Sequence, residues 1–302
     1  MKVKTALGRL REHWFLAVFG VGIPVCLFCL YVGYPIVFNV YLSFTRWNGL
    51  GPRPIFDGIF NYRFLVESSS FWVSLANTLK WVLGTLIIAN IFGLITAGLL
   101  QPKRVYLATL FRAIVFLPVT MSLVSVGIMF AFLLDPTFGI VPDVLHLLRM
   151  PDISLLGDPR VALYSLIGMF GWSYLGIPVM IYHAGISQIP PERYEAASLE
   201  GANGFQTIRY VTIPALRPVI VVVTLYSVIQ GFKNFDLIAV VTSGGPGNST
   251  NVLAFYMYIL AFQERFFGIG SAVSVILLLL SLSFVVAYLR RVGESALNAA
   301  GN

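Results

Sequence analysis

Long apolar segments alternate with short polar ones along the whole chain. The apolar segments lie at about residues 14–44, 71–100, 106–134, 161–187, 216–242 and 269–289. Each is near or above the roughly 20 residues that a helix needs to cross the hydrocarbon core of a bilayer. Backbone polar groups find no partner in lipid, so such segments are helices, and the strand alternation typical of a membrane barrel is absent. The pattern predicts an all-α integral membrane protein with six transmembrane helices.

The composition supports this class and excludes two others. The chain is 58% hydrophobic and only 11% charged, whereas soluble domains carry about 25% charged residues. A net charge of +7 could indicate a nucleic-acid partner. However, the basic residues lie beside the apolar segments, as the positive-inside rule describes, so no nucleic acid is expected.

The distribution of charge predicts an orientation. If residues 1–13 are cytoplasmic, alternate loops place most basic residues inside and most acidic residues outside, as the positive-inside rule requires. Residues 14–44 are too long for the apolar region of a signal peptide, and so they are expected to remain as the first transmembrane helix. Both termini, including the tail 291–302, are predicted to be cytoplasmic, and so is the loop 188–215.

Catalytic and metal-binding patterns are weak in this sequence. Cys26 and Cys29 lie in the middle of an apolar helix, where they are interpreted as small hydrophobic residues. The glycine-rich stretch 244–250 lacks the Lys of a phosphate loop, so the chain is not expected to hydrolyse ATP. His183 follows Ser173 by about 15 Å along one helix, too far for a nucleophile and its base. We therefore predict no catalytic residue and no metal site, and a membrane enzyme is the least supported class.

The polar loop 188–215 has the features of a short helix with a defined start and end. Pro190 and Pro191 precede it, and proline suits the first helical position because its missing N–H would be unpaired there. Glu192 and Glu195 lie in the first turns, where the helix dipole favours negative charge. Gly201 allows the chain to turn away. A short helix of small residues at a membrane surface indicates docking into a groove of another protein.

The spacing of this loop resembles the signature of ABC-importer permeases, E-A-A-x3-G-x9-I-x-L-P. Glu195-Ala196-Ala197 is followed at the same spacing by Gly201 and by Val211-Thr212-Ile213-Pro214, with two conservative apolar replacements. In that family the loop is the coupling helix that engages the cytoplasmic ATPase. The resemblance therefore implies a coupling role for Glu195, Ala196, Ala197, Gly201 and Pro214.

Other stretches are similar to the sugar-uptake branch of this family, of the maltose-transporter type. They are Tyr34-Pro35-Ile36, Leu42-Ser43-Phe44, Asn77-Thr78-Leu79 and Thr242-Ser243-Gly244-Gly245-Pro246. The resemblance implies an ABC type I importer permease fold, with a first helix over 14–44 and a core permease domain over 71–290.

The fourth and fifth apolar segments carry candidate substrate-pathway residues. Ser227, Gln230 and Asn234 recur at three- and four-residue steps and so share one helix face. Polar side chains within a membrane are costly unless they face a cavity or a partner. In the family these parts of the two helices line the translocation site, which implies Leu175, Gly176, Val179, Ser227, Gln230 and Asn234. The alternative is hydrogen bonding between helices.

Three charged residues within or near the apolar segments have no assigned role. Lys233 and Asp236 are spaced to form an ion pair on one helix near the outer interface. Lys80 lies about three turns into the second segment, where it either extends outward or lines a cavity. The sequence leaves open whether these residues are functional or structural.

The resemblance implies one permease subunit of an ATP-driven, binding-protein-dependent importer in a bacterial inner membrane, for a carbohydrate or polyol. The expected partners are a second homologous permease, a cytoplasmic ATPase dimer, an extracytoplasmic solute-binding protein and membrane lipid. The chain itself is expected to bind no cofactor, with ATP and Mg held by the ATPase. The alternative is a secondary transporter or channel, which would show inverted repeats or broken helices with intramembrane charges. We see neither in the sequence.

Overall fold

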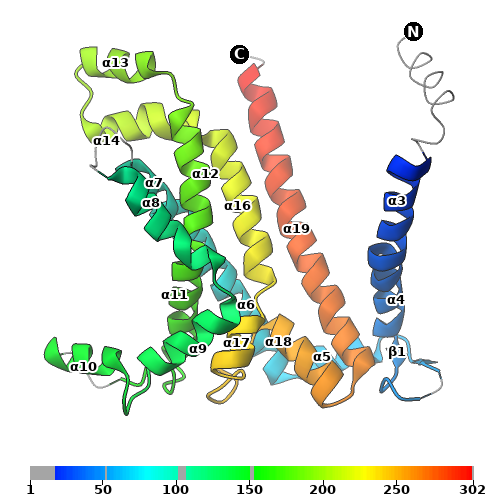
Figure 1. The fold of residues 1–302 in the computed structure, drawn as a ribbon. Coiled ribbons are helices and arrows are strands. Elements are labelled where there is room, and N and C mark those ends of the chain that lie inside the picture. The colour runs from blue at the N-terminus through cyan, green and yellow to red at the C-terminus, as the bar shows by residue number, and fades with distance from the viewer. Residues whose placement is uncertain (1–17, 52, 101–106, 150–152, 301–302) are drawn as a thin grey trace, which may run out of the picture. The chain divides into compact units, whose positions relative to one another are not determined.

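The computed structural model describes residues 18–51, 53–100, 107–149 and 153–300, and their side chains from residue 19 to residue 292. The described chain divides into two units, Met1–Glu67 with Met257–Val275, and Ser68–Tyr256 with Ile276–Asn302. Figure 1 shows their helices. Four helices are long and apolar enough to cross a membrane: Phe19–Ser43, Ser69–Leu99, Arg217–Val241 and Phe267–Val292. Two further pairs of apolar helices bring the number to six if each pair is one span. The all-α architecture is thus confirmed.

Broken helices, which we do not see in the sequence, occur in these two pairs. Ala108–Thr120 and Leu123–Leu133 meet at an angle of 100°, and Ala162–Tyr174 and Gly176–Ser187 meet at 47°. In the first pair the backbone becomes extended at Met121 and Ser122, which ends the helical hydrogen bonding. Pro118 and Pro178 each remove a backbone donor near a bend. Each break changes the direction of the span that contains it.

The first unit is organised around the end of the first span. This span comprises α3 (Ile23–Phe28), α4 (Tyr34–Ser43) and π-helical turns before each of them. A two-stranded antiparallel ribbon follows, with β1 (Thr45–Arg46) paired to β2 (Ile55–Phe56), and then α5 (Phe60–Glu67). The buried Asn61 of α5 donates hydrogen bonds to the carbonyl oxygens of Ser43 (2.9 Å) and Thr45 (2.8 Å). Asn61 therefore ties α5 to the end of the span.

The second unit contains the remaining spans and the polar loop. Its elements in chain order are α6 (Ser69–Ile87), α7 (Gly93–Leu99), α8 (Ala108–Phe116), α9 (Leu123–Leu133), α10 (Ile140–Leu147), α11 (Ala162–Tyr174), α12 (Gly176–Ser187), α13 (Pro191–Leu199), α14 (Gly204–Thr207), α15 (Ile213–Ala215), α16 (Arg217–Phe232) and α17 (Asp236–Val241). Two helices, α18 (Leu253–Tyr258) and α19 (Phe267–Ala300), have residues in both units. Within the second unit, α13 and α14 lie at one end of the α12–α16 pair, and α9, α10 and α17 lie at the other (Figure 1).

Small residues let the core helices of this unit pack closely. A Cβ atom at Gly231 of α16 would lie 3.0 Å from the Cα atom of Val82 of α6, so a larger residue there would push the two helices apart. Val82, Val228 and Phe232 form a buried apolar cluster at the same contact. Trp81 is fully buried, with its ring centroid 5.9 Å from that of Phe170 on α11. The α6–α16 contact thus positions the fifth span against the second.

Candidate coupling loop and transport pathway

The polar loop forms the short helix that its sequence predicts. Helix α13 begins with Pro191, after Pro190 in an extended conformation, and Glu192 lies in its first turn. Glu195 and Ala196 are exposed, whereas Ala197 is buried against the chain. Leu199 at the end of the helix is 90% exposed. The E-A-A sequence therefore presents two residues outward and uses the third for packing.

Gly201 closes α13 through its backbone. Its φ is +76°, the left-handed region that side chains with a Cβ disfavour. The amide of Gly201 donates to the carbonyl oxygen of Ser198 (3.1 Å), and the amide of Ala202 donates to that of Ala197 (2.9 Å). These two bonds define a Schellman motif, which satisfies carbonyl groups at a helix end. A Cβ at Gly201 would meet nothing within 4 Å, so within this chain the glycine serves conformation and not packing.

A second helical segment leads from α13 back into the bundle. The Asn203 side chain accepts a hydrogen bond from the Gln206 amide (2.9 Å), and the Gln206 side chain accepts one from the Asn203 amide (2.8 Å). Sequence reasoning missed this capping box, although the Asn-x-x-Gln spacing is a signal for it. The helix continues through a π-helical turn to α15, where Pro214 lies in the first turn. The Tyr194 and Thr212 hydroxyls, 3.3 Å apart, link α13 to this returning segment.

Most of the predicted pathway residues lie inside the unit. Val179, Ser227 and Asn234 are buried, and so is Gly176. A Cβ at Gly176 would lie 2.8 Å from the carbonyl oxygen of Val115, so this glycine permits close approach of α12 to α8. Leu175 and Gln230 are half-buried. The structure brings Ser227 and Gln230 together on α16 but places Asn234 beyond the end of that helix.

Ser227, Gln230 and Asn234, in and just after α16, differ in whether their side chains have hydrogen-bond partners. The Ser227 hydroxyl donates to the carbonyl oxygen of Val223 (2.6 Å) and lies 3.1 Å from the Tyr174 hydroxyl of α11. Gln230 donates to the Tyr226 hydroxyl (2.8 Å). By contrast, both amide atoms of Asn234 are buried without a hydrogen-bond partner among the described residues. Hydrogen bonding between helices, the alternative interpretation, is thus observed for Ser227 but not for Asn234.

Stacked aromatic rings lie beside these polar residues, between α11 and α16. The Tyr174 ring stacks on Phe170, with centroids 5.1 Å apart, and on Tyr226 of α16, with centroids 5.9 Å apart. Sequence reasoning did not assign these tyrosines, although Tyr226 precedes Gln230 by one helical turn. Hydroxyl, amide and aromatic surface therefore occur together, without a charged group among these residues.

A second polar cluster joins three spans. The side-chain oxygen of Asn90 accepts hydrogen bonds from the hydroxyls of Tyr182 on α12 (2.7 Å) and Thr224 on α16 (3.1 Å). Asn90 lies in a π-helical turn, Ile88–Phe92, between α6 and α7, and its amide donates to the carbonyl oxygen of Leu86 (3.0 Å). Sequence reasoning missed this cluster.

The structure shows the surroundings of the three charged residues to which the sequence assigned no role. Helix α16 ends at Phe232 and α17 begins at Asp236, so Lys233 and Asp236 do not lie on one continuous helix. Among the described residues no ion pair joins them, and the predicted pair is wrong. Lys80 is exposed on α6, and so it points away from the core of its unit.

The Gly-Gly-Pro loop is held by the Asn-Thr-Leu stretch of the second span. The Asn77 amide donates to the carbonyl oxygens of Ser249 (2.8 Å) and Asn251 (3.0 Å). The Thr78 hydroxyl accepts from the Leu253 amide (2.9 Å). The Asn-Thr-Leu stretch of the second span therefore contacts the residues that follow the Gly-Gly-Pro sequence.

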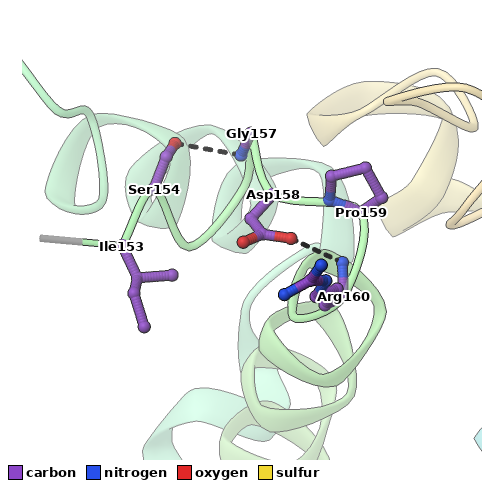
Figure 2. A pocket seen from close by; sticks show the side chains of 6 residues that line it. All are labelled: Ile153, Ser154, Gly157, Asp158, Pro159 and Arg160. Carbon is purple, nitrogen blue, oxygen red and sulfur yellow. Dashed lines mark hydrogen bonds between the residues drawn. The ribbon is translucent and has the colours of Figure 1, made fainter. Parts of the chain in front are cut away.

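The other loop at this end of the unit forms a shallow surface hollow. Figure 2 shows its lining, from Ile153 to Arg160, with the Ser154 hydroxyl accepting from the Gly157 amide (3.0 Å) and Asp158 accepting from the Arg160 amide (2.8 Å). No predicted site residue lines it. Among the described residues, no group of three or more His, Cys, Asp or Glu side chains is placed to hold a metal ion.

The apolar spans, two of them bent, define the class as a polytopic membrane protein. The model of the family described as "binding-protein-dependent transport system inner membrane component" matches residues 89–295, and the chain belongs to this family. It is therefore a multi-pass inner-membrane permease of a binding-protein-dependent ABC importer, and the uncoupled secondary transporter or channel is rejected.

Individual relatives agree with this assignment. The chain is 36% identical to a probable ABC transporter permease protein of Pyrococcus horikoshii, over 86% of this chain and 89% of that protein. It is 30% identical to the multiple sugar-binding transport system permease protein MsmF of Streptococcus mutans, over 90% and 92% of the two chains. It is 29% identical to the trehalose/maltose transport system permease protein MalF of Thermococcus litoralis, over 85% and 86%. All three are named as permeases, that is, as transport components and not as enzymes.

A solved structure supports the fold. A chain of a bacterial ABC transporter involved in the import of the acidic polysaccharide alginate superposes with a TM-score of 0.78 at 21% identity, over 96% of this chain and 99% of that one. The ABC importer permease fold is thereby confirmed.

Proposed function

We propose that this permease imports a neutral carbohydrate, a mono- or oligosaccharide, or a polyol. The observation that carries this proposal is the Asn234 amide, which is buried without a partner among the described residues and lies just beyond the end of α16, the helix that bears Tyr226 and Gln230. A buried amide without a partner costs free energy, which a hydrogen-bonding ligand would recover. Hydroxyl-rich ligands suit neutral donors and acceptors beside aromatic surface. The names of MsmF and MalF, which refer to sugars, point to the same substrate class.

The remaining partners follow from the coupling loop. A cytoplasmic ATPase dimer, which would hold ATP and Mg, would receive α13 through Glu195, Ala196 and Leu199. A second, homologous permease would complete the pathway, and a solute-binding protein would deliver the substrate from outside. The termini and the α13 loop would then lie in the cytoplasm. Closure of the ATPases would move α13, and the segment from α14 to α16 would transmit this movement to the pathway residues as a rigid-body rotation.

The test uses the complete complex reconstituted in nanodiscs with its solute-binding protein. ATP hydrolysis is measured with the binding protein preloaded from a panel of sugars, polyols, amino acids and short peptides. We expect stimulation by at least one sugar or polyol and by none of the other classes. Stimulation only by an amino acid or a peptide would overturn the carbohydrate assignment. Transport without ATP hydrolysis would overturn the coupling role.

A further inference from the structure

The segment after the first span is confined to the level of the membrane surface. Helix α4 ends at Ser43, β1 begins at Thr45, α5 ends at Glu67 and the next apolar helix begins at Ser69. A single residue at each end, Phe44 or Ser68, therefore connects residues 45–67 to a membrane-crossing helix. Because a residue spans at most about 3.6 Å, neither end of the segment can move far from the bilayer. We call residues 45–67 the interface segment.

Several large apolar side chains of the interface segment are exposed. Ile55 and Phe56 form the whole of β2, and they are 71% and 70% exposed. Leu50 and Ile59 are exposed to the same degree, 71% each. Leaving such surface in water costs about 25 cal/mol per Å², and contiguous exposed apolar patches mark interaction sites. These exposed side chains are therefore available to contact an apolar environment outside their own unit.

A cavity lies beside this apolar surface. Its volume is about 270 Å³, and it is lined by Arg46, Trp47, Phe60, Asn61, Phe64, Phe266, Gly268 and Ile269. Asn61 uses its amide hydrogens on Ser43 and Thr45, as described above. The wall of the cavity is therefore mainly aromatic and aliphatic. Such a lining suits a hydrocarbon chain better than a polar solute.

One cation lies among the residues that line this cavity. The Arg46 guanidinium lies 4.6 Å from the centroid of the Phe60 ring and 2.7 Å from a carboxylate oxygen of Asp57. A guanidinium carries five N–H donors, and the Asp57 contact involves Nε and one terminal nitrogen. Guanidinium groups bind phosphate well, and arginine side chains extend readily along apolar surface with the charge at the polar boundary.

We propose that the interface segment is a phospholipid-binding site. The exposed side chain of Ile55, which is paired with Arg46 across the ribbon, and that of Ile59 insert at the boundary of the acyl chains. The aromatic cavity takes part of one acyl chain, and Arg46 binds the phosphate. The membrane is favoured over a protein partner because a span enters the bilayer at each end of the segment, and because tryptophan and phenylalanine beside a cation are typical of the lipid interface. This inference rests on membrane insertion and not on the transported substrate.

The first experiment measures the environment of the apolar surface. Nitroxide labels are attached at Ile55→Cys and Ile59→Cys in a variant with Cys26→Ala and Cys29→Ala, because both native cysteines are exposed. The complete complex is placed in nanodiscs of phosphatidylethanolamine and phosphatidylglycerol. We expect both labels to collide more with oxygen than with a polar nickel complex, with or without the solute-binding protein. A label at the exposed Arg160 serves as the control and should show the reverse order.

Three results would overturn the proposal. Labels at residues 55 and 59 that behave like the Arg160 control would place the surface in water. Labels that become shielded only when the solute-binding protein is added would identify that protein as the occupant. Labels shielded from both reagents without it would indicate a contact with the second permease.

The second experiment tests the phosphate contact. The delipidated complex in detergent is titrated with phosphatidylglycerol, and the shift in its thermal unfolding midpoint is compared with that produced by diacylglycerol, which lacks phosphate. We expect a positive shift with the phospholipid only, retained in Arg46→Lys and lost in Arg46→Gln. Asp57→Asn removes the ion pair but keeps the cation, so it should retain the shift. An undiminished shift in Arg46→Gln, or an equal shift with diacylglycerol, would contradict the assignment.

Discussion

At the scale of single residues, the backbone conformation at Gly201 and a docked partner would restrict the side chain at this position in different ways. Its φ of +76° and the empty space around it indicate that the chain itself needs only a left-handed residue there. Asparagine tolerates this region better than alanine or β-branched residues. A docked ATPase, by contrast, would demand that the position be small.

Substitutions at Gly201 therefore test coupling. Gly201→Val should strain the helix end by about 1–2 kcal/mol and abolish uptake with membrane insertion intact. Gly201→Asp, which is both larger and charged, should also abolish uptake if the loop contacts the ATPase. Uptake and ATP hydrolysis are measured in parallel, with membrane-inserted protein as the control. Normal uptake in Gly201→Asp would contradict the coupling role, and activity in Gly201→Asn but not in Gly201→Val would show that conformation alone matters.

Asn234 and Ser227 should respond differently to alanine. Ser227 has two partners in the chain, so Ser227→Ala should weaken the bundle by about 0.6 kcal/mol, the average for interhelical bonds in membranes. Asn234 has none among the described residues. Asn234→Ala should therefore leave stability unchanged or higher, and should weaken substrate handling by about 0.5–1.5 kcal/mol. Substrate-stimulated ATP hydrolysis and thermal unfolding of the assembled complex separate the two effects. An unchanged substrate profile in Asn234→Ala would remove that residue from the pathway.

At the scale of elements, apolar runs predict spans well but do not predict their bends. Pro118 and Pro178 are visible in the sequence, yet the angle at each break depends on which helices the two halves contact. The end of α16 at Phe232 shows the same limit, since residues 227–236 continue the helical spacing and the structure does not. Backbone groups freed at such breaks need other partners. In lipid, long-range hydrogen bonds add to the close packing that holds helices together.

Asn90 is expected to hold three spans together. Asn90→Leu removes the acceptor for the Tyr182 and Thr224 hydroxyls, so it should lower the stability of the assembled permease by about 1–2 kcal/mol, roughly two interhelical bonds. Tyr182→Phe should cost about half as much. Thermal unfolding of single and double variants gives the coupling energy directly. Strict additivity of Asn90→Leu and Tyr182→Phe would show that the 2.7 Å contact contributes nothing.

At the scale of the whole molecule, the sequence predicted the class, the spans and the form of the coupling loop because each depends on local composition. Pro190, Pro191 and Gly201 act within a few residues of their positions, so their effects are readable from the sequence. The arrangement of the candidate pathway residues was harder to predict from the sequence. Ser227 meets Tyr174 across 53 residues, and Asn77 meets Ser249 across 172. Local spacing carries no information about such pairs, and a resemblance to a family identifies residues without giving their partners.

The orientation of the molecule is the last property that the sequence predicts, and it determines whether α13 can meet an ATPase. The positive-inside rule places residues 188–215 in the cytoplasm and the loops around Asp57 and Asn248 outside. Single cysteines at Asn248 and Glu200, both in a background with Cys26→Ser and Cys29→Ser, should differ in reaction with an impermeant maleimide. In intact cells Asn248→Cys should react, and Glu200→Cys should react only after the membrane is permeabilised. Because Glu200 follows the exposed end of α13 directly, its reaction after permeabilisation controls for accessibility. Labelling of Glu200→Cys from outside would put the loop beyond the reach of any cytoplasmic ATPase.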